Sequence, residues 1–152
     1  MKISNIIHEL IDKLHDDFMI VGSVSLNLNG LDVKPNKDEV DIVITNTNLI
    51  DKLHELGSVR KLEDLSNSPF NELGRYFITM EDKQFVDVYI RESLPEYNFL
   101  TFNDHKIKVS SVCEQKKFYD KVKRDYIIKD DNGHRFMGKI NNYISQLEKY
   151  EC

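Results

Sequence analysis

The apolar residues at the start of the chain recur with the period of a helix. Residues 3–14 carry them at steps of three or four positions, which predicts an amphipathic helix with one face packed inward. A second helix is expected from about residue 22 to residue 29, because Gly30 stands where helices commonly stop. Further helices are expected at about 49–56, 111–126 and 135–149.

Shorter stretches have the patterns of strands. Residues 18–21 are wholly apolar, as in a strand buried on both faces. Residues 39–45 and 84–90 instead alternate apolar and polar side chains, as in strands with one buried face. A polar turn at 81–83 predicts that the last of these forms a hairpin with a strand at 75–80. A further strand pair is expected at 99–102 and 107–109.

These elements predict a single α/β (α+β) domain over residues 1–152, with its core at about 18–90 and C-terminal helices at about 111–149. The sheet is expected to be mixed, mostly antiparallel and backed by helices. A length of 152 residues fits one domain with a core of its own. Residues 58–73 show no clear period and stay unassigned.

Two of the alternating strands carry carboxylates on the face opposite their apolar side chains. Glu39 and Asp41 share that face in the first strand, and Asp87 lies on it in the second. Carboxylates held close together repel one another, and a cation relieves the repulsion. Oxygen ligands on strands suit Mg²⁺ or Mn²⁺, and two such ions can clamp the oxygens of a phosphoryl displacement. The alternative is the solvent-facing polar face of a half-exposed sheet.

Gly22 and Ser23 join the apolar strand to the second helix. Backbone N–H groups at a helix start point outward, and the helix dipole favours an anion there. Glycine lets a phosphate approach the backbone, and the Ser23 hydroxyl can donate to it. A phosphate site is therefore predicted, although Gly22 alone would also suit a turn and Ser23 alone a helix N-cap.

The order of these motifs resembles the DNA polymerase beta-like nucleotidyltransferase superfamily, and in particular its small stand-alone members related to antitoxin-type and antibiotic-modifying enzymes. Those proteins have a hydrophobic-Gly-[Gly/Ser] step, a short helix, two acids one residue apart and a third acid on a later strand. The matching segments here are residues 21–23, 29–30, 39–42 and 86–88. A weaker match lies in the C-terminal part, where a helix bears a lysine.

The resemblance implies transfer of a nucleoside monophosphate from an NTP to an acceptor hydroxyl, with release of pyrophosphate. It implies a Mg²⁺ or Mn²⁺ cofactor, and Asp87 would also help to activate the acceptor hydroxyl. The catalytic and metal-binding residues would be Glu39, Asp41 and Asp87. The nucleotide-binding residues would be Gly22, Ser23, Lys37 and Lys121.

Other functions stay open. Glu39 stands where the family usually has aspartate, which favours, as an alternative, a degenerate module that binds a nucleotide or a protein without turnover. A metal-dependent nuclease is a third hypothesis, because Asp87 followed by Glu114 and Lys116 loosely matches an acid…Glu-x-Lys pattern. Lys121 could equally belong to a solvated, charged helix face.

Net charge, cysteine content and chain length limit the partners and the cellular setting to be expected. A net charge of −5 gives no general attraction to nucleic acid. Cys113 and Cys152 form no metal-binding motif, which predicts a reducing, cytoplasmic setting with a mobile residue at Cys152. No apolar run approaches the roughly 20 residues of a membrane span. Because so small a domain has little room for an acceptor pocket, a homodimer or a partner macromolecule is expected; the acceptor could be a small molecule, a protein or an RNA end.

Overall fold

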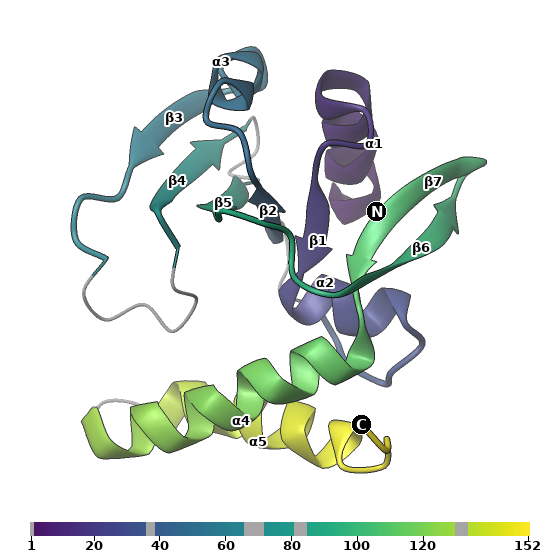
Figure 1. The fold of residues 1–152 in the computed structure, drawn as a ribbon, viewed down its shortest axis with the longest axis vertical. Coiled ribbons are helices and arrows are strands. Elements are labelled where there is room, and N and C mark those ends of the chain that lie inside the picture. The colour runs from purple at the N-terminus through teal and green to yellow at the C-terminus, as the bar shows by residue number, and fades with distance from the viewer. Residues whose placement is uncertain (1, 36–38, 66–71, 81–84, 130–133) are drawn as a thin grey trace.

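The computed structural model describes residues 2–35, 39–65, 72–80, 85–129 and 134–152 (Figure 1). These residues form one seven-stranded sheet with the order β3-β4-β5-β2-β1-β7-β6. The strands are β1 Met19–Val21, β2 Glu39–Ile44, β3 Ser58–Lys61, β4 Gly74–Thr79, β5 Phe85–Ile90, β6 Tyr97–Phe102 and β7 His105–Ser110. The helices are α1 Lys2–Leu14, α2 Gly22–Leu28, α3 Leu49–Leu53, α4 Val112–Lys129 and α5 His134–Leu147.

The sheet is mixed and mostly antiparallel, as the sequence predicts. The pairs β1–β2, β3–β4, β4–β5 and β6–β7 run antiparallel, whereas β1–β7 and β2–β5 run parallel. The parallel pair β2–β5 stands near the middle of the sheet, with β4 on one side and β1 on the other. The two strands that carry the predicted acids are therefore direct neighbours.

One face of the sheet packs against α1 and α3. The alternation of β2 and β5 turns their aliphatic side chains to this face, where they join the main core cluster with the apolar stripe of α1. This confirms the two periodicities read from the sequence. The central side chains of this face are at most 3% exposed: Val40, Ile42, Ile44, Val86, Val88 and Ile90.

The C-terminal helices form an antiparallel pair that packs on α2 rather than on the apolar sheet face. In Figure 1, α4 and α5 lie side by side below the sheet, with α2 between them and the strands. A second apolar cluster joins Leu26 of α2 to Tyr119 and Val122 of α4 and to Tyr143 and Ile144 of α5. None of the helices in the described ranges is long and apolar enough to span a bilayer.

Several predicted boundaries need correction. The third helix ends at Leu53, several residues before the predicted residue 56, and the backbone turns there toward Gly57. The segment left unassigned contains β3, Ser58–Lys61, whose mostly exposed side chains give no hydrophobic period because it is an edge strand. The predicted turn at 81–83 lies outside the described residues.

The two cysteines are joined in a disulfide, and the prediction of a mobile Cys152 is wrong. The antiparallel arrangement of α4 and α5 returns the chain to the start of α4, where Cys113 lies with its Cα 5.4 Å from that of Cys152. Lys116 Nζ also donates to the carbonyl of Tyr150 at 3.0 Å. Spacing along a sequence cannot show this proximity. The expectation of a reducing setting rested on unpaired cysteines and loses that support.

Candidate active site

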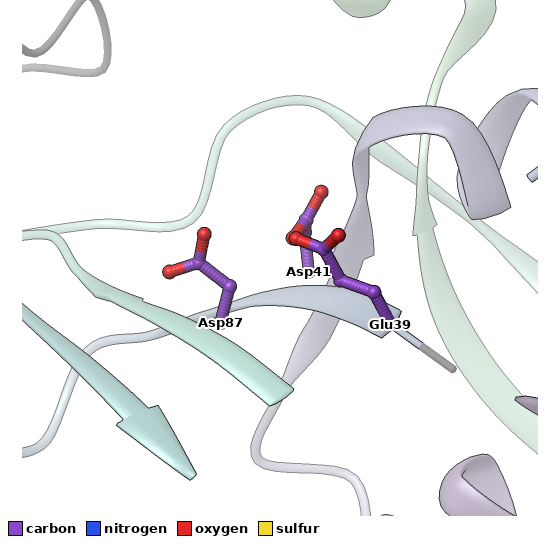
Figure 2. Close-up of side chains that lie close together, drawn as sticks. All are labelled: Glu39, Asp41 and Asp87. Atoms are coloured by element: carbon purple, nitrogen blue, oxygen red, sulfur yellow. The ribbon is translucent and has the colours of Figure 1, made fainter. Parts of the chain in front are cut away.

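The three predicted acids meet on the face of the sheet opposite the main core. Because β2 and β5 pair in parallel, Asp41 stands directly beside Asp87 and Glu39 beside Phe85. Each of the three carboxylates offers one oxygen, and these oxygens all lie within 4.8 Å of one another. Figure 2 shows the side chains of Glu39 and Asp41 rising from β2 toward that of Asp87 on β5.

Gly22 lies against the Asp41 carboxylate. Its φ of +73° belongs to the left-handed region that favours glycine, and a Cβ built there would stand 2.5 Å from Asp41 Oδ2. Any side chain at this position would displace the carboxylate. The glycine is therefore required by a close approach as well as by the turn from β1 into α2.

The environment of Asp41 disfavours its charged form. Burial raises the pKa of its carboxyl group well above 3.8, and the negative charges of Glu39 and Asp87 raise it further, while Arg75 partly offsets them. Its Oδ1 atom is buried and has no hydrogen-bond partner among the described residues. A buried oxygen without a donor, among three carboxylates, fits a site that holds a cation.

Asp87 is held by two neighbours on its own face of the sheet. Arg75 of β4 donates through Nε to Oδ1 at 2.9 Å and through Nη2 to Oδ2 at 2.6 Å. Tyr89 Oη donates to Oδ2 at 2.9 Å. Asp87 is 2% exposed, so this two-pronged ion pair lies largely out of water.

Arg75 is a site residue that the sequence analysis did not identify. Its guanidinium carbon stands 4.6 Å from the ring centroid of Tyr89 and 5.0 Å from that of Phe77. Burial alone would lower the pKa of Arg75, but the hydrogen bonds and the charge of Asp87 raise it above its ordinary value. The predicted hairpin could have placed Arg75 near the acids, because pairing β4 with β5 sets Arg75 opposite Tyr89 and Phe77 opposite Asp87.

Gly22 and Ser23 begin α2, as the sequence predicts, but Ser23 is not its N-cap. The cap position is Val21, and no side chain there caps the helix. Ser23 is buried, and a hydrogen bond between it and Tyr143 acts to lower the pKa of that tyrosine against the larger effect of burial, which raises it. The reading of Ser23 as a capping residue is therefore wrong, and its hydroxyl faces α5.

Two tyrosines of the C-terminal helices lie near the acids and were not singled out from the sequence. Tyr119 and Tyr143 contact each other with ring centroids 5.2 Å apart. Burial raises the pKa of Tyr119, and the charge of Asp41 contributes. Asp41 and Glu39 likewise raise the pKa of Tyr143. These charges act on the helix pair from β2, which no local sequence pattern could show because the elements are far apart along the chain.

Of the two predicted lysines, the described residues include only Lys121. Lys37 lies outside the described residues. Lys121 lies on α4, partly exposed and two residues after Tyr119, so its side chain leaves the helix on a different side. Glu114 and Lys116 also lie on α4, not on a strand beside Asp87, so the geometry that a nuclease pattern needs is missing from these residues.

Neither a protein-family model nor a curated protein sequence matches the chain. Solved structures do match. ANT(2″)-Ia in complex with adenylyl-2″-tobramycin has a TM-score of 0.55 at 11% identity, with 98% of each chain covered. The lincosamide antibiotic adenylyltransferase LnuA, lincomycin-bound, has a TM-score of 0.54 at 12% identity, with 97% of this chain and 94% of that chain covered.

A third solved structure has a similar fold over most of this chain. An antigenic nucleotidyltransferase-like protein from Paracoccidioides brasiliensis has a TM-score of 0.52 at 15% identity, and the match covers 95% of this chain and 73% of that chain. At these identities the likeness concerns the fold. It confirms the fold that the resemblance implies.

Proposed function

We propose that this chain, which has the fold of the DNA polymerase beta-like nucleotidyltransferases, transfers a nucleoside monophosphate from an NTP to an acceptor hydroxyl and releases pyrophosphate. The observation that carries the proposal is the meeting of Glu39, Asp41 and Asp87 within 4.8 Å beside the glycine turn into α2. We also propose that residues 1–152 act as one nucleotidyltransferase-like domain.

The three carboxylates would hold the metal. Their oxygen donors, and the buried Oδ1 of Asp41, suit Mg²⁺ or Mn²⁺. A bound divalent cation supplies charge neutralisation for the triphosphate and for the oxygens that enter and leave phosphorus. The chain's own contribution is to keep the carboxylates in register on two paired strands, so that little reorganisation is needed during the reaction.

The remaining residues would bind and orient the nucleotide. In the transfer, the acceptor oxygen bonds to the α-phosphorus, the bond from that phosphorus to the pyrophosphate oxygen breaks, and the proton of the acceptor hydroxyl passes to solvent water. Gly22 and Ser23 would lie against the triphosphate at the start of α2, and Asp87 would help to orient the acceptor hydroxyl. Lys37 and Lys121 stay proposals for further phosphate contacts.

A small hydroxyl-bearing molecule is the acceptor class we propose to test first. The two matched structures with adenylyl-tobramycin and lincomycin cover nearly the same length of chain as this protein. Chains of this extent therefore accommodate a small molecule, and the expected homodimer or partner macromolecule is not required by size. ATP is the first nucleotide to test, because LnuA is an adenylyltransferase and the ANT(2″)-Ia structure contains an adenylylated product.

Calorimetric titration of the four NTPs, with Mg²⁺, with Mn²⁺ and with EDTA, tests the site directly. We expect binding that requires the metal in the wild type and is lost in the Asp41→Ala/Asp87→Ala double variant. Glu55→Ala is the matched control, since this exposed acid pairs with Lys13 away from the cluster. A screen for pyrophosphate release with hydroxyl-bearing small molecules then identifies the acceptor.

The result that would contradict the proposal is absence of NTP binding with either metal in a folded wild-type protein. Equal binding by the wild type and the double variant would also contradict it, because the nucleotide would then bind elsewhere. Thermal unfolding of each variant shows whether lost binding reflects the site or the fold.

A degenerate binding module is the second candidate, and one observation favours it. Both oxygens of Asp87 already accept hydrogen bonds from Arg75 and Tyr89, which reduces what this carboxylate can offer a metal. Such a module would bind NTP with metal and yet release no pyrophosphate with any acceptor. The position of Glu114 and Lys116 on a helix leaves the nuclease hypothesis without supporting geometry.

A further inference from the structure

The ion pair between Arg75 and Asp87 leaves the carboxylate only part of its bonding capacity. A carboxylate has about four lone-pair positions, two on each oxygen. Within the described ranges, Oδ2 accepts from Arg75 Nη2 and from Tyr89 Oη, whereas Oδ1 accepts only from Arg75 Nε. One position, on Oδ1, therefore remains for a cation while these three donors stay in place.

The orientation of the guanidinium is fixed from several sides. The rings of Phe77 and Tyr89 lie against Arg75, with their centroids 5.0 and 4.6 Å from its central carbon. The donors at its edge point to Asp87. A packing residue would need the ring contacts alone, so the two additional hydrogen bonds indicate a role toward the carboxylate.

Arg75 also changes the charge that a cation meets. When all three carboxylates are ionised, as a bound cation requires, they carry three negative charges, and the guanidinium beside them offsets one. The group is then left with the charge that a single divalent cation balances. Without Arg75 the buried Asp87 would keep only the Tyr89 hydroxyl as a partner in this group.

We propose that Arg75 is a positioning residue of the acidic cluster: it fixes the Asp87 carboxylate so that one lone pair of Oδ1 remains for the metal, and it limits the nucleotide-free site to one divalent cation. This inference rests on the proposed function for the identity of the site. It assigns to Arg75 both a geometric role, through its two-pronged hydrogen bonds, and an electrostatic one.

The two roles separate in a pair of variants. Arg75→Met removes both, and Arg75→Lys keeps the charge without the planar fork. In Mn²⁺ titrations without nucleotide, followed by the electron paramagnetic resonance of free Mn²⁺, we expect one ion per wild-type chain. Removing a positive charge beside the site should tighten Mn²⁺ binding of Arg75→Met by about fivefold or add a second ion, whereas Arg75→Lys stays near wild type.

Thermal unfolding supplies a second readout. We expect Arg75→Met to unfold at a lower temperature than wild type in EDTA, and Mn²⁺ to raise its midpoint more than it raises that of the wild type, because the cation takes over part of the lost compensation. Arg60→Met is the matched control. Arg60 also lies over the Phe77 ring, at 5.3 Å, but it is exposed and on β3.

Measurements of turnover distinguish a positioning role of Arg75 from a purely structural one. Both Arg75 variants should lower kcat for pyrophosphate release by about tenfold or more, with KM for the NTP changed by less than about threefold, since a displaced Asp87 affects the reacting geometry. Unchanged or weaker Mn²⁺ binding by Arg75→Met, or an increase of its unfolding midpoint by Mn²⁺ no larger than that of the wild type, would overturn the proposal. So would wild-type kcat in Arg75→Lys.

The outcomes also separate this inference from the proposed function. If the wild type binds Mn²⁺ and NTP but releases no pyrophosphate, the transfer reaction fails while the Mn²⁺ arms still decide the role of Arg75. If the wild type turns over and Mn²⁺ binding is the same in wild type and Arg75→Met, the function stands and the role of Arg75 falls. Absence of Mn²⁺ binding by the wild type defeats both.

Discussion

The two faces of the strand pair β2–β5 differ in the side chains they carry and in whether those side chains stabilise the sheet. On one face, aliphatic side chains pack against α1 and α3 and are almost fully buried. On the other, three carboxylates converge, one of them with a buried oxygen that has no hydrogen-bond partner among the described residues. The same six-residue strands thus present a stabilising surface and a strained one, in strict alternation.

The difference shows where the free energy for a functional site comes from. Like charges at the same register on neighbouring strands destabilise a sheet. The packing of the apolar face, worth roughly 1.5–3 kcal/mol for each large side chain buried, offsets that repulsion. Because the two faces share one backbone, the core fixes the positions of the acids without contacting them.

The largest expected effect comes from placing a carboxylate on the wrong face. Ile42→Asp introduces a carboxylate at the residue after Asp41 on β2. Ile42 itself is fully buried in the main core. An unpaired buried charge should cost more than about 4 kcal/mol, enough to unfold the domain, as measured by urea denaturation. Ile42→Val, the control, should cost only about 0.5–1.5 kcal/mol. A folded Ile42→Asp protein of near-native stability would break the comparison.

The next effect concerns the disulfide, which closes the helix pair that packs on α2. Cys113→Ser opens a cross-link between residues 39 apart, which chain-entropy arguments value at about 4 kcal/mol. We expect faster hydrogen exchange in α4 and α5, with the amides of α1 and β2 still protected. Equal loss of protection in both regions would show that the helix pair and the main core are not independent. A Ser substitution at Cys152 should give the same result.

Gly22→Ala tests the acidic face by a smaller perturbation. The left-handed backbone should cost about 1–2 kcal/mol, and the added Cβ would push against Asp41 Oδ2. Gly30→Ala is a matched control, because Gly30 also has a positive φ but nothing lies within 4 Å of its Cβ position. Urea denaturation should show similar losses in both, while Mn²⁺ binding should weaken only in Gly22→Ala. Equal Mn²⁺ binding by the two variants would contradict the role given to this contact.

The smallest effect is a slope of stability with pH. Burial, and then the neighbouring acids, raise the pKa of Asp41 above its unfolded value, so the native state binds more protons than the unfolded state. In EDTA, this group's contribution to stability should therefore fall as pH rises from about 3.8 toward the raised pKa, by no more than about 1.4 kcal/mol per pH unit. Asp41→Asn should remove that part of the slope, and Mn²⁺ should suppress it. Identical slopes in wild type and Asp41→Asn would contradict the assignment.

The sequence predicted those parts of the molecule that local periodicity determines. Alternation in β2 and β5 placed Glu39, Asp41 and Asp87 on one face, and the glycine step located the start of α2. Periodicity could not show Arg75 beside Asp87, because that contact depends on the register between β4 and β5. The edge strand β3 was missed since it buries little, and the disulfide because it depends on how α4 and α5 fold back.

The parallel pairing of β2 with β5 also has a consequence for how the protein folds. Parallel neighbours need a crossover, and here α3, β3 and β4 must be passed before β5 can take its place beside β2. Pairing across so long a loop is slow compared with forming a hairpin or a helix. The full set of acids is therefore absent from any locally folded intermediate, so the appearance of Mn²⁺ binding during refolding would time the closure of the sheet itself.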